Sequence, residues 1–195
     1  AFYCYSQHMR APVREKPDTQ ILPILAPIDV CRIHAIDNPL CWERQYIKQI
    51  VEDWKVLGVR MMYRGYLFHL ADAGIPFSMI RQVRAEFPYY HRMGMIACRV
   101  ECKPAWAYHG PSLYLAAKIM WDPSLNVDTL LDDYFTKFYG PAAEPMRLHF
   151  NHLEQAFREA DYHTGNVFDI PYILNPRVML KLESSLESAE QAVSG

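Results

Sequence analysis

Apolar and polar positions along the chain follow two alternating patterns. Four short apolar runs are present, and the last three are nearly continuous and bounded by Pro, Gly or Asp, which is typical of strands buried on both faces of a parallel sheet. In the segments that follow the last three runs, apolar residues recur at helical intervals. The predicted strands are 2–6, 20–28, 59–67 and 95–102, and the predicted helices are 41–57, 77–93 and 111–121. Pro88 is expected to kink or shorten the second helix.

This succession of strand and helix with short links is typical of parallel βαβ units wound in one hand. After residue 122 the pattern changes to helices only, expected over 127–139, 141–160 and 176–193. We therefore predict an α/β fold, the C-terminal half of a (β/α)8 TIM barrel followed by an all-helical tail. The expected domains are a half-barrel over 1–123 and a helical region over 124–195.

A half-barrel leaves two open sheet edges, and unpaired strand edges seek partners. The chain also opens directly on an aromatic, strand-like run, so we expect the N-terminal strands of the barrel to precede residue 1. The rival architecture is an open doubly wound sheet. That fold commonly carries a Gly-rich phosphate loop, and neither G-x-G-x-x-G nor G-x-x-x-x-G-K-S/T occurs here.

Charge and hydropathy narrow the classes of partner. The formal net charge is -2, and no dense block of Lys and Arg is present, which argues against a nucleic acid or an anionic membrane as partner. No apolar run approaches the roughly 20 residues that cross a bilayer. We expect a soluble protein, either cytoplasmic or exported.

Five cysteines are too few and too irregularly placed for a disulfide scaffold. Cys31 and Cys41 are candidates for a local disulfide in an exported protein, or for buried thiols. With His34 they also form a Cys-x2-His-x6-Cys pattern. Only three soft ligands are evident, and the spacing is not that of a zinc finger, so we expect no metal. No motif requires a cofactor.

In a (β/α)8 barrel the reactive groups lie where strands end and βα loops begin. Asp29, Arg32 and His34 follow the second run, and Glu101 lies at the end of the fourth. Carboxylates and an imidazole at these places can bind sugar hydroxyls or act as acid and base. Two simpler interpretations stay open. Asp29 can cap its loop and pair with Arg32, and Glu101 can pair with a neighbouring basic residue, Arg99 or Lys103.

Aromatic residues gather in the segment after the fourth run. Trp106, Tyr108 and His109 lie in a loop too short to form its own core, and Tyr66 lies near the end of the third run. Aromatic faces that stack on a pyranose, with polar tips near its hydroxyls, form a carbohydrate platform. Alternatively, Trp106 packs over the rim of the barrel.

Several stretches give the chain a family resemblance. They are 114–123, 126–131 and 138–143, together with 27–31, His34, Cys41 and the opening strand. With these residues the chain resembles the DUF4838 family, uncharacterised proteins placed among the glycoside-hydrolase barrels. The resemblance implies a barrel and a bacterial carbohydrate-processing context. It also implies an acidic residue near the end of the last barrel strand, which Glu101 matches, although Cys102-Lys103-Pro104 replaces the expected Gly-rich segment.

We therefore expect a glycoside hydrolase that acts on a complex glycan. Glu101 and Asp29 are the catalytic candidates, and the substrate-binding candidates are Arg32, His34, Tyr66, Trp106, Tyr108 and His109. The partners expected are an oligosaccharide or polysaccharide substrate and the N-terminal half of the same protein. An alternative is a carbohydrate-binding barrel without catalysis. A third hypothesis gives the helical tail a role in self-association.

Overall fold

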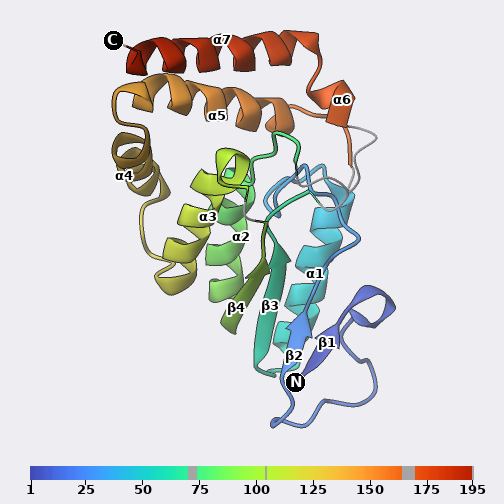
Figure 1. The fold of residues 1–195 in the computed structure, drawn as a ribbon. Helices are drawn as coiled ribbons and strands as arrows, with labels where there is room; N and C mark the ends of the chain where they lie inside the picture. Colours follow the sequence, from blue (N-terminus) through green and yellow to red (C-terminus); the bar gives the residue numbers. More distant parts are fainter. Residues whose placement is uncertain (70–73, 104, 164–169, 195) are drawn as a thin grey trace.

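A sheet of four parallel strands forms one part of the molecule (Figure 1). The computed structural model describes residues 1–69, 74–103, 105–163 and 170–194. The strands are β1 (Phe2–Cys4), β2 (Pro23–Leu25), β3 (Met61–Tyr66) and β4 (Met95–Glu101). They lie side by side in chain order, β1-β2-β3-β4. All four predicted strands are present, but β2 is shorter than predicted: it begins at Pro23 and ends before Pro27, and neither proline has an N–H to donate.

Helices cover one face of this sheet. The ring of Tyr63 in β3 packs against Tyr90, with ring centroids 4.1 Å apart, and Phe2 lies 6.5 Å from Trp54. Tyr90 belongs to α2 (Ile80–Arg92) and Trp54 to α1 (Trp42–Val56). Side chains alternate between faces along a strand. Residues next to these in sequence, such as Tyr3, therefore point to the opposite face.

The predicted helix ends agree with glycines in the left-handed conformation. Gly58 follows α1 with a φ of 64°, and Gly94 follows α2 with a φ of 89°. Both conformations favour glycine because it has no Cβ. Pro88 does not shorten α2 at its C-terminal end, since the helix continues through this residue to Arg92. One missing backbone hydrogen bond does not end a helix that tertiary packing holds in place on both sides of the proline.

The segment after β4 also differs from the prediction. The helix α3 (Trp106–Trp121) begins five residues before the expected start at Pro111, so the aromatic residues lie in its first turns and not in a loop. The Ala105 carbonyl accepts from the N–H groups of Tyr108 and His109, which starts the helix. Further along, Gly110 lies against the hydroxyl of Tyr134, and a Cβ at this position would clash with it.

Helices make up the rest of the described chain. They are α4 (Val127–Tyr139), α5 (Ala143–Arg158), the short α6 (Ile170–Ile173) and α7 (Pro176–Val193), with 3-10 helices η1 (Ser6–His8) and η2 (Gly140–Ala142). Asn126 and Asn175 cap α4 and α7 through their side-chain oxygens, as helix-start residues do. Figure 1 shows α5 and α7 next to each other, on the side toward which the strands point. Among the described residues no helix is long and apolar enough to span a membrane.

Two buried ion pairs connect α2 to its neighbouring helices α1 and α5. Arg44 of α1 contacts Glu86 of α2 at 2.9 Å. Arg81 of α2 contacts Glu154 of α5 at 3.1 Å. Glu154 also accepts from the backbone N–H groups of Ile80 and Arg81, so a side chain of α5 caps the start of α2. The helical region is thus tied to the sheet layer by charge as well as by apolar packing.

Candidate functional site

Three polar side chains meet on the face of the sheet that the helices leave open. Arg64 of β3 donates to Glu101 of β4 at 2.6 Å and to the Tyr3 hydroxyl of β1 at 2.9 Å. The side chains of Glu101 and Arg64 are 43% and 23% exposed, and Tyr3 is 45% exposed. The strands place these groups at neighbouring positions on one surface. A carboxylate, a guanidinium and a phenol are therefore held together where solvent and a ligand can reach them.

Tyr66 and Arg32 lie beside this group. Tyr66 is paired in register with Glu101, and its ring lies 5.6 Å from the guanidinium of Arg64 and 4.9 Å from that of Arg32. Arg32 is buried and donates to the carbonyl of Ile28 at 2.9 Å. Burial lowers the pKa of Arg32 to about 10 and raises the pKa of Tyr66. These two residues stack on each other, so Tyr66 is not an exposed platform.

The ion pairs predicted for Asp29 and Glu101 from the sequence do not form. The hydrogen bonds of Arg32 go to backbone carbonyls, including those of Ile28 and Tyr66, and not to Asp29, which is exposed. Glu101 pairs with Arg64 on the neighbouring strand and not with Arg99 or Lys103. The Lys103 ammonium lies over the ring of Phe68 instead. Sequence reasoning missed Tyr3 and Arg64, which the period-two alternation of a strand places on the face of Glu101.

Trp106 and Tyr108 lie in a different place. They line a groove of 870 Å³ between the start of α3 and the helices α5 and α7. Trp106 is 52% exposed, whereas His109 is fully buried. Three carboxylates of α7 also line the groove: Glu183, Glu187 and Glu190. The predicted aromatic residues thus form a separate surface, and His109 does not reach it.

His34 lies apart from both surfaces. It is buried, and its Nδ1 lies 3.5 Å from the Sγ of Cys31. Hydrogen bonds, chiefly with Cys41 and also with His34, outweigh burial and lower the pKa of the Cys31 thiol. His34 is thus part of a cysteine and histidine cluster at the start of α1.

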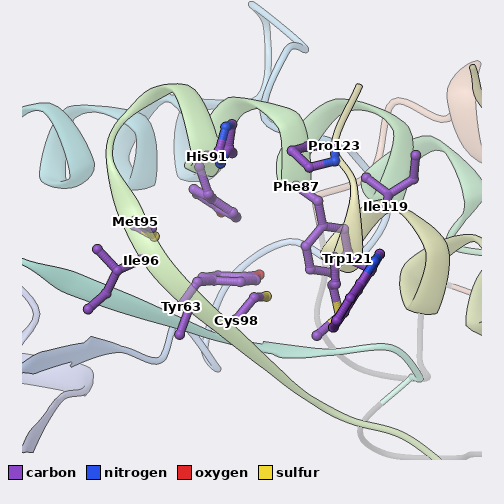
Figure 2. A pocket seen from close by; sticks show the side chains of 12 residues that line it. Tyr63, Phe87, His91, Met95, Ile96, Cys98, Ile119, Trp121 and Pro123 are labelled. Atoms are coloured by element: carbon purple, nitrogen blue, oxygen red, sulfur yellow. The ribbon is translucent and has the colours of Figure 1, made fainter. Parts of the chain in front are cut away.

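A small pocket of 150 Å³ opens between α2, the first half of β4 and the end of α3 (Figure 2). Figure 2 shows Tyr63, Phe87 and Trp121 around it, with Cys98 at its base. Burial raises the pKa of the Cys98 thiol to about 12, so Cys98 is not an activated nucleophile. The pocket lies away from the carboxyl ends of the strands.

The chain matches a known family. The model of a family described as "Domain of unknown function (DUF4838)" matches residues 1–152. No curated protein and no solved structure matches the chain.

Proposed function

The chain belongs to the DUF4838 family, and from this premise we propose that it is a glycoside hydrolase whose site lies on the open face of the sheet. The observation that carries the proposal is the group formed by Tyr3, Arg64 and Glu101. Glu101 ends its strand and is exposed, and Arg64 fixes its orientation. An acidic residue at the carboxyl end of a parallel strand is well placed for glycosidic chemistry.

We further propose that the sheet is half of a (β/α)8 barrel. Its strands follow one another in chain order, whereas a doubly wound sheet reverses its order at a switch point. The helices lie on one face, as they do outside a barrel. The other face carries polar groups, and every residue of β4 is exposed or half-buried although its sequence is largely apolar. Additional strands at the two edges of the sheet would bury this surface and close the barrel.

Glycosidases use two carboxyl groups that flank the bond. In this proposal Glu101 supplies one of them, and Asp29 in the loop after β2 is the candidate for the second. One carboxyl group protonates the leaving oxygen, and the other activates water or attacks the anomeric carbon. Arg64 and Tyr3 orient Glu101 and donate to sugar hydroxyls.

The substitution Glu101→Gln tests this assignment. It keeps the shape and an acceptor but removes the charge and the proton-transfer group. We expect glycan hydrolysis by the full-length protein to fall at least 100-fold, as it does when an acid-base group is lost. Reducing-sugar release from a panel of complex glycans measures the effect.

Glu52→Gln is the matched control, because it makes the same chemical change on α1, which packs on the other face of the sheet. We expect it to leave hydrolysis unchanged. Equal activity of Glu101→Gln and the wild-type protein, at equal thermal stability, would contradict the proposal.

The groove beside α3 supports a second candidate function, carbohydrate binding without hydrolysis. The exposed ring of Trp106 and the carboxylates of α7 combine a stacking surface with hydroxyl acceptors. Trp106→Ala should then weaken glycan binding at least 10-fold, measured by calorimetry. Trp121→Ala is the control, since Trp121 is 91% exposed and lies outside the groove. Unchanged binding in Trp106→Ala excludes this function for the groove.

A further inference from the structure

Four metal-ligating side chains converge at the start of α1. Cys31, His34 and Cys41 lie in the loop between β2 and α1, and His163 follows α5. Their sulfur and nitrogen atoms all lie within 4.8 Å of one another. Cys31, His34 and Cys41 are buried, while His163 is exposed. Two thiols and two imidazoles from distant parts of the chain thus share one small volume.

The distances suit a tetrahedral ion. Zinc bonds of about 2.3 Å to sulfur and 2.0 Å to nitrogen place the ligand atoms about 3.3 to 3.8 Å apart around a tetrahedron. Here the Sγ of Cys31 lies 3.5 Å from the Nδ1 of His34, and the Sγ of Cys41 lies 3.2 Å from the Nδ1 of His163. The two imidazole rings are 4.9 Å apart. Only small shifts would bring all four atoms to bonding distance of a central ion.

The surroundings orient the ligands. The Nε2 of His34 lies 2.9 Å from the carbonyl of Ala160, so an Nε2–H donates to this oxygen and leaves Nδ1 free to ligate. Zinc-bound histidines commonly make such a bond to a carbonyl or carboxylate. The loop before Cys41 is fixed by Asn38, whose side chain accepts from Cys41 N–H, and by Gln45, which donates to the Asn38 carbonyl. Groups that are not ligands therefore fix the ring of His34 and the loop before Cys41.

We propose that these residues form a Cys2His2 site for a structural zinc ion. Tetrahedral sulfur and nitrogen ligands select zinc among the common divalent cations. Four protein ligands fill its coordination shell, which is typical of structural and not of catalytic zinc. The ion would join the loop after β2, which carries Asp29 and Arg32, to the segment after α5. This inference is independent of the proposed glycosidase function, because it concerns other side chains.

Zinc content and cobalt spectroscopy of the purified full-length protein test the site. We expect one zinc per chain, removed by a chelator together with a fall in melting temperature, and restored by added zinc. Cobalt bound to the metal-free protein should give the d–d bands of a tetrahedral ion and a thiolate charge-transfer band. Cys31→Ser should lose the metal, whereas Cys98→Ser, a thiol outside the cluster, should keep it.

The variant His163→Ala separates a loss of zinc binding from misfolding, because His163 is exposed and its replacement should leave the fold intact. We expect the variant to weaken zinc binding at least 10-fold, with a changed cobalt spectrum, while His152→Ala on α5 has no effect. Zinc affinity unchanged in His163→Ala, well under one zinc per wild-type chain after saturation, or a Cys31–Cys41 disulfide in the purified protein would each overturn the proposal.

Discussion

Arg44→Met should lower the free energy of unfolding by about 3 to 5 kcal/mol at pH 8, the cost of leaving one partner of a buried ion pair without the other. Arg44 and Glu86 are both almost completely buried and lie 2.9 Å apart. Methionine fills much of the volume but leaves the buried carboxylate of Glu86 without its ion-pair partner, and the hydrogen bond from the Tyr63 hydroxyl at 3.5 Å does not replace the lost charge. Since domains of this size are stable by only about 5 to 15 kcal/mol, much of the stability would be lost.

The loss should shrink as the pH falls. Burial already raises the pKa of Glu86 in the folded protein, and removal of Arg44 raises this pKa further. A carboxyl whose folded pKa exceeds its unfolded pKa favours the folded state while it is protonated, and this stability disappears as the pH rises through the folded pKa. Urea unfolding at about pH 5 and pH 8 should therefore show a smaller difference from wild type at the lower pH.

Arg84→Met is the matched control for Arg44→Met. Arg84 also forms an ion pair from α2, but its side chain is 42% exposed and that of its partner Asp128 is 72% exposed. Exposed pairs contribute less than about 1 kcal/mol. Equal losses in the two variants would show that the Arg44–Glu86 pair contributes no more than a surface contact.

Glu154→Ala should also lower the free energy of unfolding by about 3 to 5 kcal/mol. The carboxylate accepts from the N–H groups of Ile80 and Arg81, at 3.2 and 3.1 Å, and pairs with the Arg81 guanidinium. Alanine leaves the first N–H groups of α2 and a buried guanidinium without this acceptor. Because Glu154 lies on α5, the variant should also weaken the attachment of the helical region.

Urea unfolding measures this effect, and hydrogen exchange locates it. We expect faster exchange at the start of α2 and in α5. Glu144→Ala is the control on the same helix, since Glu144 is 84% exposed and its contact to Arg147 is 3.6 Å long. A loss below about 1 kcal/mol for Glu154→Ala would contradict the role of this carboxylate as a buried cap.

Most of the fold follows from local patterns. The spacing of apolar residues predicted the four strands, and the glycines that follow α1 and α2 predicted where these helices end. Both signals depend only on residues that are close in sequence. The start of α3 was missed because Pro111 is typical of a first turn, whereas here the helix begins at Trp106. The barrel and the boundary between a half-barrel and a helical region stay predictions.

The candidate sites show where sequence reasoning ends. The sequence places Glu101 and Tyr66 near strand ends, because strand ends can be located from local patterns. The partner of Glu101, Arg64, becomes evident only from the pairing of β3 with β4. The sequence does not predict a metal site, because only three candidate ligands lie in one loop. The fourth, His163, is 122 residues from Cys41 along the chain, so only the fold brings it into view.

The crystal structure of the full-length protein with a bound oligosaccharide tests the central claim most directly. We predict a sugar ring on the open face of the sheet, with Glu101 next to the glycosidic oxygen and Arg64 and Tyr3 at the sugar hydroxyls. A sugar bound only in the groove at Trp106, or other chain segments packed over Tyr3 and Glu101 so that no ligand can enter, would contradict a glycosidase site on this face.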